Sequence, residues 1–152
     1  PPLIGDAPPP APELPTTHLV PGHSKGAPRR PSAPCPASTA ARGSGAAITW
    51  LLGGQFEQIS HCINNMIGDV SGIICDGAGS TCSMKVSTST SAAVKSSLMA
   101  INNLHVPQSE GIVSDDVDQT IANLGRLSKQ GMLDTDIEII NIMRAKQQGK
   151  AG

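Results

Sequence analysis

The sequence predicts an all-α fold, a compact bundle of four or five short helices over about residues 46–147, preceded by a disordered proline-rich segment. Two observations carry this prediction. Apolar residues in the second part of the chain recur every three or four positions, the spacing of one helix face, and no alternating run is long enough for a sheet. Twelve of the thirteen prolines lie within residues 1–36. We therefore divide the chain into residues 1–45 and residues 46–152.

Composition excludes several classes of function. The 152-residue chain has a formal net charge of −1, so it offers no broad electrostatic attraction to nucleic acid or to an anionic membrane. It contains one tryptophan, one phenylalanine and no tyrosine, which excludes base-stacking platforms. No apolar run is long enough to span a membrane, and no targeting signal is visible. We therefore expect a cytoplasmic protein that binds no nucleic acid and no membrane, with its cysteines as reduced thiols or metal ligands.

Residues 1–45 are dominated by proline, which removes backbone hydrogen-bond donors and fixes φ. Their few apolar side chains cannot offset the entropy of ordering the segment. We predict a disordered or polyproline-like tail. PxxP-like spacing at Pro9–Pro12 and Pro12–Pro15 also fits docking to a proline-recognition domain, but a solvated extension is the favoured interpretation.

The first ordered elements are a short apolar segment and a longer helix. Residues 46–52 are apolar, and this segment ends at the pair Gly53-Gly54. A helix is predicted from Gln55 to about Val70, because its apolar residues form one stripe at helical spacing. The stripe consists of Phe56, Ile59, Ile63, Met66, Ile67 and Val70. The glycine-rich residues that follow, 71–82, are predicted to form a loop.

A second long helix is predicted from about Ser83 to Asn102. Its apolar positions are Val86, Ala93, Val94, Leu98 and Ile101. Serine and threonine make up ten of the eighteen residues 80–97. Small side chains allow helices to approach closely, and hydroxyl groups can serve a site. Close packing is the favoured interpretation of these residues.

The next helix is predicted from its start signals. After a connection that holds Pro107, Ser114 is expected to cap a helix. The first turn carries Asp115, Asp116 and Asp118. Three clustered carboxylates also fit a metal site, but the dipole at a helix start favours anions, so capping is the better explanation. The predicted buried stripe is Val117, Ile121, Leu124 and Leu127.

The last helix follows Gly131, which stands where a glycine would end the preceding one. Thr135 and Glu138 have the spacing of a capping box. The helix is expected to fray over residues 147–152, which completes the predicted bundle.

Candidate chemistry concentrates in the glycine-rich loop, where Cys75 and Cys82 lie seven residues apart. Such a loop can curl both sulfur atoms toward one point, and its N–H groups can bond to cluster sulfides or to a carboxylate. Cys82 also stands at a predicted helix start, where the dipole favours a thiolate. Spacing alone leaves two interpretations open, a metal or cluster site and a chance pair of buried cysteines. A zinc site is disfavoured, because no paired CxxC motif or His-x₃-His motif is present.

A series of short blocks in this part of the chain adds to that argument. The blocks are Leu51-Leu52-Gly53-Gly54, Asn65-Met66-Ile67-Gly68, Gly72-Ile73-Ile74-Cys75-Asp76-Gly77-Ala78, Cys82-Ser83-Met84-Lys85, Glu110-Gly111-Ile112-Val113, Thr120-Ile121-Ala122-Asn123-Leu124-Gly125, and Gly131-Met132 with Thr135-Asp136 and Ile142-Met143. In this order they closely resemble the C-terminal end of the L-cysteine desulfidase family, which is related to the alpha chain of iron–sulfur L-serine dehydratase. The resemblance covers about residues 43–146.

This resemblance implies a [4Fe–4S] cluster held by three cysteines. Its open iron acts as a Lewis acid in the α,β-elimination of L-cysteine or L-serine to pyruvate, ammonia and sulfide or water. Cys75 and Cys82 match two of the family's cluster ligands. Cys35 stands forty residues before Cys75 and is the candidate third ligand, although its neighbours Pro34 and Pro36 do not resemble the family's segment. Cys62 has no counterpart in the family and is predicted to be a buried core thiol.

Two departures from the family qualify this expectation. Gly79 stands where the family usually carries a lysine. Family members also have a long N-terminal portion that supplies much of the active site, including the acid–base group, and none of it is visible here. We therefore leave the catalytic residues unassigned and expect the chain to be inactive without that portion or a subunit that carries it. The alternative is a non-catalytic helical remnant or interaction module without a cluster.

The abrupt change in composition suggests one further hypothesis. Residues 1–45 are rich in proline, arginine, alanine and serine, and they end where the resemblance begins, near Gly43. Out-of-frame translation of GC-rich DNA often yields such a segment.

Overall fold

The computed structural model describes residues 36–74 and 80–148, and within these ranges all regular structure is helical, which confirms the predicted all-α class. The elements are α1 (Pro36–Leu51), α2 (Phe56–Val70), α3 (Ser80–Ile101), α4 (Val117–Arg126), the π-helical turn η2 (Leu127–Gly131) and α5 (Leu133–Gln148). The N-terminal segment is predicted to be disordered, and its residues 1–35 lie outside the described residues. None of the described helices is long and apolar enough to cross a membrane.

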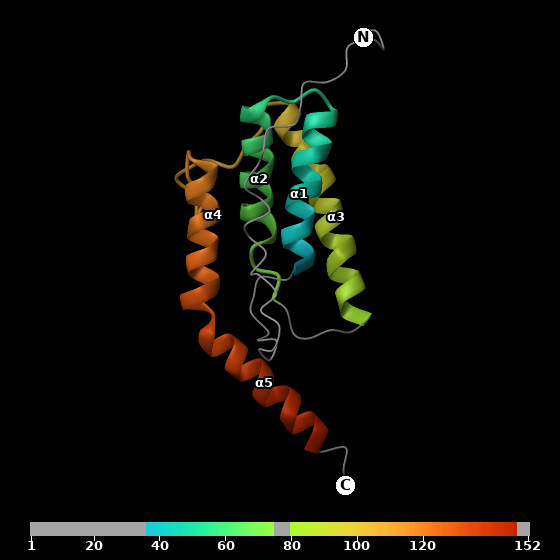
Figure 1. Cartoon of the computed structure of the whole chain (residues 1–152), viewed down its shortest axis with the longest axis vertical. Coiled ribbons are helices and arrows are strands. Elements are labelled where there is room, and N and C mark those ends of the chain that lie inside the picture. The colour runs from blue at the N-terminus through green and yellow to red at the C-terminus, as the bar shows by residue number, and fades with distance from the viewer. Residues whose placement is uncertain (1–35, 75–79, 149–152) are drawn as a thin grey trace, which may run out of the picture.

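Three helices form the bundle that positions the candidate site (Figure 1). Helices α1 and α3 run parallel to each other, and α2 runs antiparallel to both, so that each helix contacts the other two. Helix α4 packs beside α2, and α5 leaves the bundle beyond the end at which α1 and α3 begin. No residue of α5 is buried.

Helix α1 begins at Pro36, ten residues before the predicted boundary at residue 46. Proline is well tolerated in the first turn of a helix, because the N–H that it lacks has no intrahelical partner there. Pro36 is also the last proline before Pro107. Residues 36–45 therefore belong to α1 and not to a disordered segment, so the ordered part begins ten residues earlier than we predicted.

Helix α2 spans the residues that its apolar stripe predicts. Its buried apolar face contains Ile59, Cys62, Ile63, Met66, Ile67 and Val70. Phe56 is the exception, because its side chain is 60% exposed. It stands at the first position of the helix, at the edge of the bundle. The position of a residue on the stripe therefore predicts burial only where a neighbouring helix covers that turn.

Helix α3 buries small side chains rather than the large apolar ones that we expected. Its buried residues are Ser89, Ala92, Ala93, Ser96, Ser97 and Ala100. Val86, Val94 and Leu98 are exposed, which corrects their assignment to the core. The reason is a close approach of α1: a Cβ atom at Gly45 would lie 3.6 Å from the Cα of Ala93. The packing interpretation of the serine-rich sequence is thus confirmed for the three buried serines.

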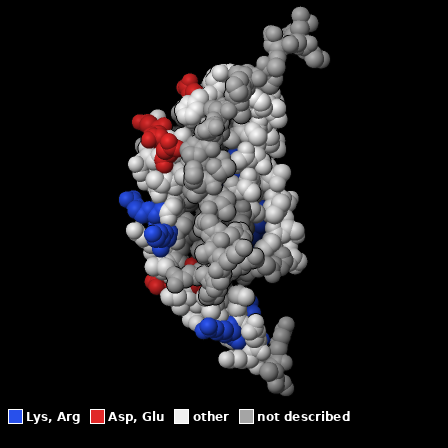
Figure 2. Space-filling model, in the orientation of Figure 1, with Lys and Arg blue, Asp and Glu red and all other residues white. Residues whose placement is uncertain are grey.

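Helix α4 is capped by Asp116, whose carboxylate accepts a hydrogen bond of 2.9 Å from the N–H of Asp118. Ser114 is not the cap, because it lies two residues before Asp116; its N–H donates to the Thr120 hydroxyl at 2.9 Å. The aspartates cap and charge the helix start as predicted, and Figure 2 shows acidic side chains gathered over that part of the molecule. Leu127 was placed on the buried stripe but is 42% exposed, because it lies in η2 beyond the end of α4.

The start of α5 also differs from the prediction. The π-helical turn carries the chain through Gly131 without a left-handed residue, and α5 begins at Leu133. Thr135 therefore lies inside the helix and cannot form the predicted capping box with Glu138. A glycine after an apolar stripe predicts a helix end, but here the backbone continues in a wider turn.

Candidate metal centre and its surroundings

The candidate metal centre lies at the end of the bundle where α1 and α3 begin and α2 ends (Figure 1). Cys82 is the third residue of α3. In the sequence, Cys35 directly precedes α1 and Cys75 directly follows Ile74 in the connection between α2 and α3. Cys35 and Cys75 lie outside the described residues, so the structure places Cys82 alone of the three predicted ligands. The described residues that adjoin the two others in the sequence, at the start of α1 and after the end of α2, lie at this same end of the bundle.

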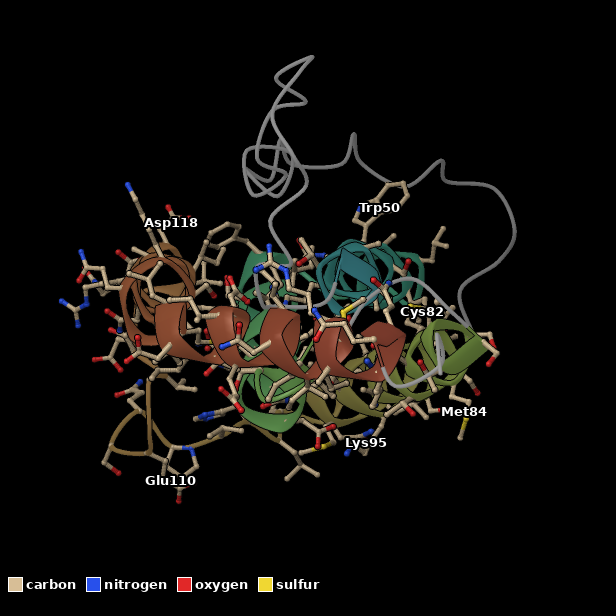
Figure 3. The ribbon with its side chains drawn as sticks, turned by 90° about the horizontal axis from the view of Figure 1, so that it is seen from below. Trp50, Cys82, Met84, Lys95, Glu110 and Asp118 are labelled. Carbon is tan, nitrogen blue, oxygen red and sulfur yellow. The ribbon has the colours of Figure 1, made fainter. Side chains whose placement is uncertain are left out.

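Cys82 is half-buried. Seen from below, it lies on the side of α3 that faces α1, whereas Met84 points away from the bundle (Figure 3). Neither α1 nor α3 has an acidic residue in its first turn. The N-termini of two described helices therefore lie at this end without an acidic side chain in their first turns, and the partial positive charge of a helix start favours an anion.

The described part of the chain contains no group of three histidine, cysteine, aspartate or glutamate side chains that could hold a metal ion. A three-cysteine site therefore requires Cys35 and Cys75. Three thiolates would fit an iron–sulfur cluster, because cysteines are the usual cluster ligands. An anionic thiolate cluster also fits the positive potential of two helix starts.

Cys62 lies elsewhere, in the middle of the bundle. Its side chain is fully buried in the core cluster that contains Met66 and Ala93. The Cys62 Sγ lies 3.5 Å from the Ser97 Oγ. The prediction of a buried core thiol is confirmed.

Arg42 is a residue that the sequence analysis missed. Its side chain on α1 is 2% exposed, and its Nε and Nη2 atoms are buried with no hydrogen-bond partner. Burial lowers the pKa of Arg42 from its ordinary value to about 10. The assignment of residues 1–45 to a disordered tail concealed it. The available signal was the stripe of Ser38, Arg42, Gly45 and Thr49, which has helical spacing and follows the last proline of the cluster.

A pair of histidines lies near the opposite end of the bundle. His61 on α2 stacks on His105 in the connection after α3, with ring centroids 4.3 Å apart. Asn65 holds this connection by donating to the Leu104 carbonyl at 3.0 Å and accepting from the Val106 N–H at 2.8 Å. Burial lowers the pKa of His61, the charge of His105 lowers it further, and Glu57 opposes the shift.

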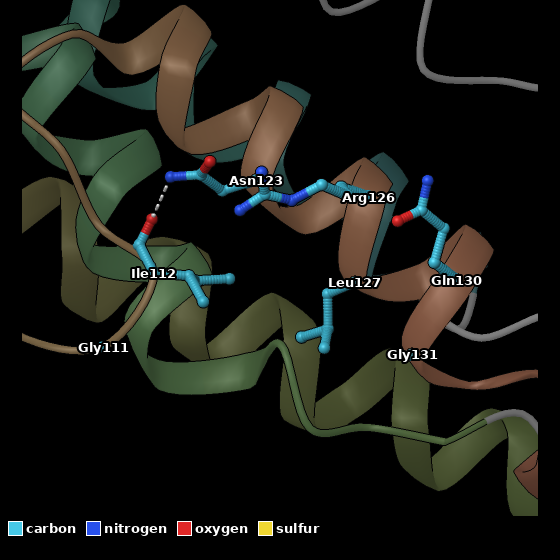
Figure 4. A pocket seen from close by; sticks show the side chains of 7 residues that line it. All are labelled: Gly111, Ile112, Asn123, Arg126, Leu127, Gln130 and Gly131. Carbon is cyan, nitrogen blue, oxygen red and sulfur yellow. Dashed lines mark hydrogen bonds between the residues drawn. The ribbon is translucent and has the colours of Figure 1, made fainter.

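A shallow hollow of about 440 Å³ lies between η2 and the connection that precedes α4 (Figure 4). It is lined by Gly111, Ile112, Asn123, Arg126, Leu127, Gln130 and Gly131. The Asn123 amide closes one side by donating to the Ile112 carbonyl at 3.0 Å. The lining has no carboxylate, thiol or imidazole, so it offers no acid–base or nucleophilic chemistry.

Comparisons with known proteins point to one family. A family model described as serine dehydratase alpha chain matches residues 12–141. A protein named UPF0597 from Aeromonas hydrophila is 88% identical over 135 residues, which are 89% of this chain and 31% of that protein. The UPF0597 protein YhaM of Escherichia coli is 55% identical over 117 residues, 77% of this chain and 27% of the relative. No solved structure matches the chain.

These matches reach further upstream than the predicted resemblance. The family match begins at residue 12, whereas we placed the start of the resemblance near Gly43. The family match thus extends into the proline-rich segment. The chain also spans only about 31% of the Aeromonas relatives that it matches.

Proposed function

The chain belongs to the serine dehydratase alpha chain family, and from this membership we propose that it is the cluster-binding part of an iron–sulfur lyase. The proposed reaction is the α,β-elimination of L-cysteine or L-serine, which yields pyruvate, ammonia and sulfide or water. The observation that supports the proposal concerns the described residues next to the three cysteines in the sequence. The start of α1 after Cys35, the chain after α2 before Cys75 and the first turn of α3 with Cys82 lie at one end of the bundle (Figure 1).

Cys35, Cys75 and Cys82 are the residues that would hold a [4Fe–4S] cluster there. When bound, such a cluster supplies a Lewis acid at an iron without a protein ligand. The starts of α1 and α3 would stabilise the negative charge of the cluster and its thiolates. Cys62 takes no part, because it is buried against Ser97 in the core.

The proposed partner is the part of the longer family proteins that this chain does not match, present either in the same polypeptide or as a separate subunit. The match covers 31% of the Aeromonas hydrophila relative, so more than two thirds of that relative lies outside the part that corresponds to this chain. The outer face of α3 exposes the large apolar side chains of Met84, Val94 and Leu98, which a neighbouring part of the protein can cover. We propose that this portion supplies the base that removes the α-proton, and that the chain alone does not turn over substrate. We also propose a cytoplasmic location, where thiols stay reduced.

Anaerobic reconstitution with iron and sulfide tests the cluster. The expected result is visible charge-transfer absorbance with about four irons and four sulfides per chain, as in a [4Fe–4S] centre. Cys82→Ser, Cys75→Ser and Cys35→Ser should each abolish or strongly reduce it. Cys62→Ser is the matched control and should retain the cluster. Equal losses in all four variants, or no iron uptake by the unaltered chain, would contradict the proposal.

We expect turnover only when the unmatched part of the longer family proteins is present. A chimaera provides that part: this chain replaces the matching 135 residues of the Aeromonas hydrophila relative. Anaerobic assays of pyruvate and sulfide with L-cysteine and with L-serine then identify the substrate. The non-catalytic alternative is supported instead if this chimaera binds no iron and forms no pyruvate from either amino acid.

A further inference from the structure

The buried guanidinium of Arg42 lacks the partner that its charge requires. Removing an arginine from water without an ion pair is unfavourable, and such groups persist in proteins where they meet an anion. Here the Nε and Nη2 atoms are buried without a hydrogen bond. Desolvation is the cause of the lowered Arg42 pKa, and within residues 36–74 and 80–148 no carboxylate acts against it. The missing partner is therefore an anion from outside the described residues.

The packing of α1 on α3 places a second unpartnered group, the Ser89 hydroxyl, level with Arg42 along the axis of the bundle. Gly45 lies against Ala93, and its carbonyl lies 2.9 Å from the Ser97 hydroxyl. Because the two helices run parallel with equal rise, one turn back from this contact brings Arg42 on α1 level with Ser89 on α3. Ser89 is fully buried, and its hydroxyl has no hydrogen-bond partner.

In the sequence, Arg42 comes seven residues after Cys35, and Ser89 comes seven residues after Cys82. Cys82 and Ser89 both lie on α3, where seven residues are two helical turns, or about 10 Å of rise. Arg42 lies in the second turn of α1, six residues after its first residue, Pro36. Side chains on a helix lean toward its N-terminus, so the long arginine side chain extends back along α1 toward the cluster end.

We infer that Arg42, with Ser89 beside it, binds the α-carboxylate of the amino-acid substrate. This inference rests on the proposed lyase function. The planar guanidinium presents two N–H groups in the geometry of a carboxylate, and the serine hydroxyl donates a further hydrogen bond. Binding the carboxylate above the cluster end would direct the β-substituent of the amino acid toward the open iron. Arg42 is thus a substrate-binding residue.

The stability of the ligand-free protein is the first test. In Arg42→Met, an apolar side chain of similar length replaces an unpaired buried charge, so the midpoint of thermal unfolding should rise. The control Arg126→Met makes the same change at an exposed position of α4 and should leave the midpoint unchanged. A fall in the midpoint of Arg42→Met would mean that a carboxylate of the protein already pairs with Arg42, which overturns the inference.

Ligand binding is the second test, measured by calorimetry on the reconstituted chimaera. The probes are L-cysteine and cysteamine, which lacks the carboxylate. Arg42→Met should weaken L-cysteine binding about 100-fold, the size expected for a charge-assisted bidentate pair, and leave cysteamine binding unchanged. Arg42→Lys should recover part of the loss, and Ser89→Ala should lose less than Arg42→Met.

The outcomes separate this inference from the proposed function. If the unaltered chimaera holds a cluster and binds L-cysteine, but Arg42→Met binds it equally well, only the role of Arg42 is overturned. Equal weakening of L-cysteine and cysteamine also overturns that role, because it indicates general damage to the site. If the unaltered chimaera holds no cluster and binds neither probe, both proposals fail.

Discussion

The hydroxyl oxygen of Ser97 on α3 lies 2.9 Å from the carbonyl oxygen of Gly45 on α1. The same hydroxyl is 2.7 Å from the Ala93 carbonyl of its own helix and 3.5 Å from the Cys62 Sγ on α2. One small side chain thus connects all three helices of the bundle. Such a contact is available only because serine and glycine let the two parallel helices approach closely.

Ser97→Ala should destabilise the bundle by about 1 kcal/mol, the usual net value of a buried hydrogen bond. Urea unfolding followed by circular dichroism measures this change. Ser91→Ala, on the exposed face of the same helix, is the control and should be neutral or slightly stabilising, because alanine is the better helix former. Equal effects of the two substitutions would show that the contact with α1 contributes nothing.

Gly45→Ala should also destabilise the protein. The added Cβ would lie 2.7 Å from the Met66 Sδ and 3.1 Å from the Cys62 Sγ. Overpacking of this kind costs about 1–3 kcal/mol, which exceeds the gain of up to about 1 kcal/mol from replacing a helical glycine.

Gly43→Ala is the matched control for this substitution. Gly43 is on the same helix, and an added Cβ there would meet nothing within 4 Å. Only the gain in helix propensity applies, so this variant should be more stable than the unaltered protein by up to about 1 kcal/mol. A stabilised Gly45→Ala variant in the same urea titration would contradict the close approach of α1 to α2 and α3.

Asp116→Ala should remove the cap of α4 at a cost of about 1 kcal/mol. Its carboxylate accepts from the Asp118 N–H, so Asp116→Asn should retain most of the stability. Asp115→Ala tests whether charge alone is responsible, because this exposed neighbour is not the cap. Amide hydrogen exchange in the first turn of α4 reports the change locally, and equal exchange in the two alanine variants would refute the role of Asp116.

The histidine pair should make the stability of the protein dependent on pH. Because the pKa of His61 is lowered by folding, the unfolded chain binds the proton more readily than the folded one. This contribution to stability is present above the ordinary value of 6.5 and is lost as the pH falls through the lower pKa of the folded state. Thermal unfolding midpoints measured between about pH 5 and pH 8, the range in which histidine titrates, should therefore fall on the acid side.

Two variants isolate this effect. His61→Gln removes the titrating group and should flatten the dependence of the midpoint on pH in this range. His105→Gln removes the nearby charge that helps to lower the His61 pKa, so the dependence should become shallower but persist through burial. An unchanged pH profile in His61→Gln would assign the dependence to other groups.

Local pattern in the sequence was sufficient for several features. The apolar stripe predicted α2, the aspartate cluster predicted the start of α4 to within two residues, and Cys62 was correctly expected in the core. These features depend on spacing within one or two turns, so the surrounding structure has little influence on them. Cys82 was likewise expected at a helix start, and it lies in the first turn of α3.

Other features depended on contacts between residues far apart in the chain. The sequence did not show that α1 begins as early as Pro36. The first turns of α1 consist of small residues without an apolar stripe, and this helix packs against α2 and α3. Nor did the sequence show that α3 buries its serines and alanines and exposes Val94 and Leu98. Hydrophobicity predicts which side chains prefer to be buried, but the close approach at Gly45 leaves room only for small ones. Arg42 is 2% exposed, and the burial of this charged side chain is likewise a property of the folded protein that local pattern did not predict.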